Sequence, residues 1–180
     1  MGTIKCALEP ALLFTGILFK DDTIYQETRT RLIEKCGPVL AESEVRDFSF
    51  TDYYEKEMGP DLKRVFISFL HLVHPHDLAA LKCFTNELEE ESSLEGRRRI
   101  NIDPGYLHLA KVILASTKDY SHRIYLDAGI FAEVTLRFER GSFAALEWTY
   151  PDYKDPKTLE FFNHVRKLYF EHLRGTGRTS

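Results

Sequence analysis

The first half of the chain alternates strand-like and helix-like patterns of apolar residues. Residues 11–19 are almost continuously apolar, which is typical of a strand covered on both faces. The following residues up to 36 predict a helix, because Asp21 or Asp22 can cap its start and Gly37-Pro38 stops it. Residues 39–50 and 64–73 then predict two strands. A further helix, with proline in its first turn, is predicted over residues 74–91.

In the second half, a short strand and a long apolar helix precede three consecutive strands and a final helix. These elements are predicted at residues 100–103, 104–117, 122–126, 130–138, 143–148 and 155–173. Asp103-Pro104 has the sequence of a helix start, with Asp at the cap and Pro at the first helical position, and Asp155-Pro156 repeats it. The short loop Asp127-Ala128-Gly129 predicts that its two flanking strands form a hairpin.

The resulting order is β-α-β-β-α-β-α-β-β-β-α, without an internal repeat. Consecutive hairpin strands dominate the second half, so we predict an α+β fold: a single domain with a mixed, mostly antiparallel sheet and helices packed on it. The domain is predicted to span residues 10–173. Residues 1–9 are expected to form a loose N-terminal segment and residues 174–180 a flexible tail.

Composition narrows the classes of function. The net charge of −4 argues against a generic nucleic-acid coat protein or a polybasic membrane binder. No apolar run reaches the roughly 18 residues of a membrane span, and the N-terminus lacks the pattern of a signal peptide, so we expect a cytoplasmic protein with no membrane partner. The three cysteines are widely spaced and predict neither a disulfide framework nor a zinc site.

Three candidate functional residues gather after the predicted apolar helix: Lys118, His122 and Arg123. If the three-residue loop sets the hairpin register, Arg123 lies opposite Glu133 and Tyr125 opposite Phe131. The predicted core face of this hairpin consists of Ile124, Leu126, Ile130, Ala132, Val134 and Leu136. The other face carries Arg123, Tyr125, Glu133, Thr135 and Arg137, and it is either a set of ordinary cross-strand pairs or the floor of a ligand site. For an enzyme, acid–base catalysis by His122 with Glu133 is the simplest mechanism.

Two glycines and an aspartate offer further candidates for ligand contact. Helix capping alone explains Asp103, but a helix N-terminus also collects free backbone N–H groups, and Gly105 would let a ligand approach them. Gly16, in the middle of the first strand, indicates either tight packing or the approach of a backbone or ligand.

The segment 48–59 combines aromatic and acidic residues and is predicted to be irregular. Its candidates for ligand contact are Asp52, Tyr53, Tyr54 and Glu57. Acid and phenol groups in such a segment can orient a sugar or base, or chelate a divalent cation. Alternatively, the aromatic residues fix the loop to the core while the acids face water. Two other segments also have alternative interpretations. Trp148–Tyr153 either stacks on a planar ligand or packs the last helix against the sheet. Arg97–Arg99 either binds phosphate or is simply solvated.

Motifs of nucleotide binding and hydrolysis are absent from the sequence. There is no GxxxxGK[ST] phosphate loop, no GxGxxG, no GxSxG and no HExxH. Thr117-Lys118-Asp119 is one residue shorter than the guanine-reading TKxD element, so without a phosphate loop we do not predict a GTPase. The spacing of His71, His74 and His76 is not diagnostic of a metal site. The cofactor is therefore undetermined, and a divalent cation is the one candidate.

Four phrases of the sequence resemble a known family. They are Phe50–Gly59, Asn101–Leu107, Ser116–Tyr125 and Trp148–Tyr153. They are similar to the bacterial domain-of-unknown-function 4416 family, over roughly residues 10–170. The resemblance implies a bacterial single-domain protein, sometimes labelled GTP-binding, and it implies no catalytic residues.

We expect a domain that binds an anionic small molecule, either a nucleotide or a phosphorylated metabolite. A non-catalytic protein-interaction module that uses segment 48–59 is the alternative, with an undetermined protein partner. RNA binding is third, because it rests only on the arginines and tyrosines, and a nucleic-acid partner is not expected. If the acids of residues 52–57 meet residues 118–123 and Glu133 in one concave pocket, ligand binding is favoured. Positions on opposite faces would favour the interaction module.

Overall fold

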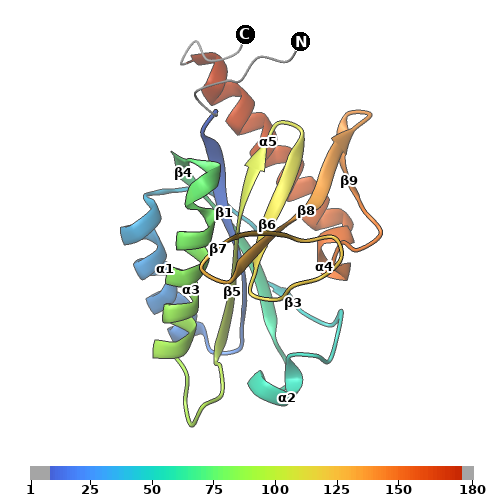
Figure 1. Cartoon of the computed structure of the whole chain (residues 1–180). Helices are drawn as coiled ribbons and strands as arrows, with labels where there is room; N and C mark the ends of the chain where they lie inside the picture. The colour runs from blue at the N-terminus through green and yellow to red at the C-terminus, as the bar shows by residue number, and fades with distance from the viewer. Residues whose placement is uncertain (1–8, 176–180) are drawn as a thin grey trace.

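Nine strands form one open sheet, and every pairing between described residues is antiparallel. The structure is a computed structural model that describes residues 9–175. The strands are β1 (Ala11–Phe19), β2 (Val39–Glu42), β3 (Arg46–Asp47), β4 (Lys63–Val73), β5 (Ile100–His108), β6 (Lys111–Ser116), β7 (Ile124–Asp127), β8 (Ile130–Glu139) and β9 (Ser142–Ala145). Their order is β2-β4-β1-β5-β6-β8-β7, with β3 paired to β4 and β9 to β8 (Figure 1).

Helices cover both faces of the sheet. Helices α1 (Asp22–Cys36) and α3 (Leu78–Glu91) lie on one face, and α5 (Pro156–Gly175) lies on the other (Figure 1). The short helices are α2 (Glu55–Met58), the 3-10 turn η1 (Pro75–Asp77) and α4 (Pro151–Lys154). Along β1, Leu13 and Ile17 pack with the α1 and α3 layer, whereas Leu12 and Phe14 pack with α5. The α+β prediction and the two-sided burial of the first strand are therefore confirmed.

The predicted helix over residues 104–117 is wrong. These residues form the second half of β5 and all of β6, with a turn at residues 109–110. The two strands pair from Gly105↔Leu114 to His108↔Lys111. Both lie in the middle of a sheet that is covered on two faces, so their apolar run shows no two-residue period and resembles a buried helix. Asp103-Pro104 consequently lies inside a strand and does not start a helix.

The predicted hairpin register is confirmed, but its predicted core face is only partly correct. Tyr125 pairs with Phe131 and Ile124 with Ala132, as the loop length indicates, before the register shifts at Asp127. Ile124 is nevertheless 72% exposed, because β7 is the edge strand of the sheet. The strand predicted over residues 39–50 is also corrected, since it consists of two short strands, β2 and β3.

The predicted domain boundaries at residues 10 and 173 stay predictions. Helix α5 continues to Gly175, two residues beyond the predicted end of the domain at residue 173. The remainder of the predicted tail, and residues 1–8 of the predicted loose segment, lie outside the described residues. Within residues 9–175, no helix is both long and apolar enough to cross a membrane.

Candidate functional site

The sheet splits between β5 and β6, and two charged side chains of α3 fill the gap beside β5. Strand pairing stops at Gly105↔Leu114, so the start of β5 has no β6 neighbour. In its place, Lys82 Nζ donates to Ile102 O at 2.8 Å, and Glu89 Oε1 accepts from Ile102 N at 2.7 Å. Backbone groups two residues apart face the same edge of a strand. Pro104 faces this edge too, and it has no N–H that needs a partner.

A cavity of about 700 Å³ lies beside this split. It is walled by segment 48–59, by parts of β4, β5, β6 and β8, by α3 and by the start of α4. The ionisable residues that line it, apart from tyrosines, are Arg64, Lys82, Glu89, Arg98, Asp103, Lys118, Glu133 and Asp152. Its aromatic lining consists of Phe48, Phe50, Tyr53, Tyr54, Tyr150 and Tyr153. The wall is therefore both charged and aromatic.

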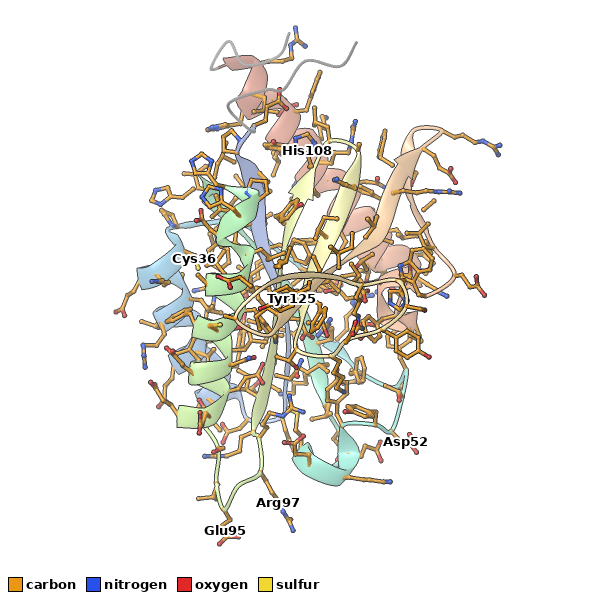
Figure 2. The ribbon with its side chains drawn as sticks, in the orientation of Figure 1. Cys36, Asp52, Glu95, Arg97, His108 and Tyr125 are labelled. Atoms are coloured by element: carbon orange, nitrogen blue, oxygen red, sulfur yellow. The ribbon has the colours of Figure 1, made fainter. Side chains whose placement is uncertain are left out.

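The structure brings most of the predicted site residues to this one cavity. Those that line it directly are Tyr53, Tyr54, Asp103, Lys118 and Glu133. Those that instead contact a lining residue are Glu57, His122 and Arg123. Asp52, Gly105 and Tyr125 do not line the cavity; Figure 2 shows Asp52 beside α2 and Tyr125 on the separate strand β7. The acidic-aromatic segment and the Lys118–Arg123 turn thus lie on one side of the molecule.

Arg123 and Glu133 form the predicted cross-strand pair and hold the turn that carries Lys118. Arg123 Nε donates to Glu133 Oε2 at 2.8 Å, and its Nη1 donates to the carbonyl oxygen of Lys118 at 2.9 Å. Its Nη2 donates to Tyr150 Oη at 2.7 Å. Burial lowers the pKa of Arg123, but Glu133 outweighs it and the pKa is raised overall, so the guanidinium stays charged. The pair therefore fixes the backbone of the cavity wall.

His122 contacts the same carboxylate from outside the cavity lining. Its Nε2 lies 3.2 Å from Glu133 Oε2, and its ring stacks on Trp148 at a centroid distance of 5.0 Å. Glu133 Oε1 also accepts a hydrogen bond from Thr135 Oγ1 at 3.2 Å. Both oxygens of the predicted catalytic carboxylate therefore already have protein partners, and the catalytic role of this pair stays a prediction.

Arg64, which the sequence did not indicate, is buried at the back of the cavity. Its Nη2 lies 2.9 Å from Asp152 Oδ2, and its Nη1 lies 3.6 Å from Asp103 Oδ2, an ion-pair distance too long for a hydrogen bond. Nε and Nη1 have no hydrogen-bond partner within residues 9–175. A Cβ on Gly16 would lie 2.8 Å from Arg64 Nη2, so this glycine makes room for the guanidinium.

Gly105 has a packing function in this structure. A Cβ at this position would lie 2.3 Å from the carbonyl oxygen of Ile113 and 2.5 Å from Cζ of Phe14. Only glycine therefore allows β6 and Phe14 to approach β5 so closely. The helix N-terminus that motivated its prediction as a ligand contact does not exist, because residues 100–108 are a strand.

Arg98 connects segment 48–59 with α3 and β5. It donates to both carboxylate oxygens of Glu57, at 2.8 and 2.7 Å, and to Glu89 Oε2 at 3.2 Å. It also donates to Asn101 Oδ1 at 2.9 Å, while Asn101 Nδ2 donates to Asp103 Oδ2 at 2.8 Å. Arg98 is the central residue of the Arg97–Arg99 run, and it binds acids of its own chain. It is therefore not free to bind phosphate as one alternative for this run predicted.

Burial shifts the pKa of several cavity residues. Burial raises the pKa of Asp152, although the nearby charge of Arg64 lowers it. Burial likewise raises the pKa of Glu89, although the nearby charge of Lys82 lowers it. Burial also raises the pKa of Tyr54 and Tyr153, so both phenols keep their protons near neutral pH. The cavity therefore presents phenol O–H groups as donors together with carboxylate acceptors.

No group of three or more His, Cys, Asp or Glu side chains within residues 9–175 is arranged to hold a metal ion. His74 and His76 stack on each other at 5.2 Å, and His76 lies 3.4 Å from Asp77. No metal ligand can therefore be assigned from the geometry.

One protein family matches most of the chain. The family described as "Domain of unknown function (DUF4416)" matches residues 9–169 of the chain. The chain belongs to this family. The DUF4416 match includes every residue that lines the cavity, from Leu18 to Tyr153. Neither a search of curated proteins nor a search of solved structures found a match to this chain.

The sequence contains one signal that could have revealed the buried charges of this DUF4416 domain. Leu78, Lys82, Thr85 and Glu89 follow one another at spacings of four, three and four residues, which places them on one face of α3. All four are buried. Charged residues on an apolar helix face indicate buried partners. Arg64 has no comparable signal, because in the sequence it is the polar start of an alternating strand.

Proposed function

We propose that this domain binds an anionic small molecule, a nucleotide or a phosphorylated metabolite, in the cavity beside the β5–β6 split. The observation that carries the proposal is the convergence of segment 48–59 with Lys118 and Glu133 on one concave wall. The volume lies within the roughly 300–1,000 Å³ that is usual for small-molecule sites.

The chemistry of the wall supports a ligand that is partly aromatic or sugar-like and partly anionic. Tyr53 and Tyr54 offer rings, which lie edge to face at 5.0 Å, and phenol groups at the cavity. Lys118 offers an ammonium group with no carboxylate within 4.0 Å in the part of the chain that is described. If the ligand is also a substrate, His122 and Glu133 are the proposed acid–base pair.

A thermal-shift screen of the full chain with two matched variants tests the proposal. The ligands are nucleotides, sugar phosphates and divalent cations. Asn86→Phe puts a ring into the cavity from α3, whereas Glu87→Phe places the same ring on the exposed next residue, which does not line the cavity. We expect at least one ligand to raise the Tm of the wild type and of Glu87→Phe, and to have no effect on Asn86→Phe.

The unliganded Tm of each variant shows whether it is folded. An equal ligand-induced shift in Asn86→Phe would place the binding site elsewhere, and no shift with any ligand would contradict the proposal.

The interaction module is the second candidate, because Phe50 and Tyr53 of segment 48–59 are exposed. RNA binding stays third. It requires an affinity that falls steeply with salt, so a flat salt response would exclude it.

A further inference from the structure

The charged side chains of the cavity wall balance one another. Four cations line it, namely Arg64, Lys82, Arg98 and Lys118, against four acids, Glu89, Asp103, Glu133 and Asp152. Arg64 pairs with Asp152 at 2.9 Å and Lys82 with Asp103 at 3.6 Å. Arg98 pairs with Glu89 at 3.2 Å, and Glu133 pairs with Arg123 at 2.8 Å. Seven of the eight groups are therefore neutralised by the protein itself.

Lys118 is the exception among these cations. Its Nζ hydrogen-bonds to Tyr53 Oη and lies 4.5 Å from the centroid of that ring. An ammonium has three donor hydrogens and a phenol has one. One ammonium hydrogen is used in this contact, which leaves two on Lys118 and the phenolic hydrogen of Tyr53. These donors suit the oxygens of one anionic group placed beside them.

The opposite part of the wall presents acceptors. Asp103 exposes 25% of its side chain, whereas the side chains of Glu89, Glu133 and Asp152 expose 8% or less. Asp103 is therefore the carboxylate that a ligand meets, and it accepts hydrogen bonds from hydroxyl or amino groups. The amide of Asn86, on the same wall, has no hydrogen-bond partner within the described chain.

We infer that the cavity takes a ligand with one phosphate group and several hydroxyl or amino groups, and that it discriminates against ligands with two or three phosphates. The phosphate lies beside Lys118 and Tyr53, and the hydroxyl or amino groups lie toward Asp103 and Asn86. Mononucleotides and sugar monophosphates share this chemistry. The inference rests on the proposed function and specifies its ligand class.

Charge explains the discrimination. Each added phosphate brings negative charge into a cavity whose other cations already have carboxylate partners. To gain a cation, it must compete with one of those carboxylates, such as Asp152 beside Arg64. Otherwise, the added phosphate lies near the carboxylate of Asp103 and has no cation beside it. A single phosphate requires neither rearrangement, because Lys118 has no carboxylate within 4.0 Å among residues 9–175.

Isothermal titration calorimetry of the full chain tests this inference. The nucleotide arm uses the mono-, di- and triphosphates of adenosine and guanosine, each with and without Mg²⁺. The sugar arm compares fructose 6-phosphate with fructose 1,6-bisphosphate. We expect a monophosphate to bind at least about tenfold more tightly than its di- or triphosphate or bisphosphate counterpart. The arm in which this occurs identifies the source of the phosphate.

Three variants locate the determinants. Lys118→Met is expected to weaken monophosphate binding about tenfold or more, whereas Lys111→Met, at the other end of β6 and outside the cavity, leaves it unchanged. Asp103→Asn removes a repelling charge and narrows the ratio between mono- and triphosphate affinities. Triphosphate binding as tight as monophosphate binding, with or without Mg²⁺, would overturn the inference and leave the proposed function intact. Failure of every ligand in both arms would contradict the proposed function itself.

Discussion

At the scale of single residues, Lys82 and Glu89 take the place of a strand beside β5. They bond both backbone groups of Ile102 that face the split. A buried N–H or C=O without a partner costs about 1–3 kcal/mol, so these bonds offset part of the cost of burying two charges. We conclude that the charged wall of the cavity is also a structural support of the central sheet.

Replacing Glu89 tests this support. Glu89→Leu leaves Ile102 N without its acceptor and removes the carboxylate that is paired with Lys82 and Arg98, so we expect the free energy of unfolding to fall by about 3–5 kcal/mol in urea denaturation. Glu89→Gln keeps an acceptor for Ile102 and should lose less. Glu90→Leu, on the exposed next residue, is the control and should stay within about 0.5 kcal/mol. Losses of equal size in Glu89→Leu and Glu90→Leu would contradict the structural role.

Whether a site residue could be predicted from the sequence depended on how local its contacts are. The pair Arg123–Glu133 followed from the length of one loop, because a hairpin loop sets the register of its own strands. Arg64 instead depends on β4 lying next to β1, where Gly16 leaves it space, and on the distant Asp152. No short-range pattern contains that information.

At the scale of elements, the hairpin β5–β6 shows where hydrophobic patterning fails. A strand covered on both faces and a buried helix both read as continuous apolar runs. The fold class was nevertheless correct, because it rested on the consecutive hairpins of the second half. Replacing the expected helix with one more hairpin only strengthens the antiparallel character of the sheet.

Segment 48–59 is attached to the cavity in two ways. Met58 and the partly buried Tyr54 pack against Leu18, at the end of β1. Polar contacts to the wall come from Tyr53, which meets Lys118, and from Glu57, which meets Arg98. Tyr54 therefore helps to fix the segment to the core, as one of the sequence alternatives held for its aromatic residues, while part of the polar surface of the segment completes the cavity.

The attachment by Glu57 should depend on pH. Hydrogen bonding by Arg98 lowers the pKa of Glu57 below its ordinary 4.5. The stabilisation by this pair is therefore present above about pH 4.5 and is lost as the pH falls through the lowered pKa. We expect Glu57→Gln to have a Tm about 1–3 °C below wild type near pH 7, and the difference to shrink as the pH falls below about 4.5 toward 3.

Glu55→Gln is the matched control, because Glu55 lies exposed on the same short helix. Its Tm should follow the wild type at both pH values. A deficit of Glu57→Gln that persists unchanged at about pH 3 would show that Glu57 acts by packing and not by charge.

At the scale of the whole molecule, the split in the sheet links stability to the proposed function. An uninterrupted ladder from β5 to β6 would leave no cavity beside it. The interruption creates backbone groups that need partners, and the charged side chains that serve them also line the cavity. Segment 48–59 and the Lys118 turn complete the wall, although they are far apart in the sequence. Their convergence is a property of the fold that the sequence could only suggest.

The most direct test of the central claim is an amide ¹H–¹⁵N NMR titration of the full chain with the tightest-binding monophosphate. We predict that the largest shift changes occur at residues 51, 53 and 54, at 116–118 and at 150–153, which line the cavity from three separate segments. The edge strand β7 and the second half of α5 should change little. Large changes confined to β7 or α1, or no changes at saturating ligand, would contradict the account.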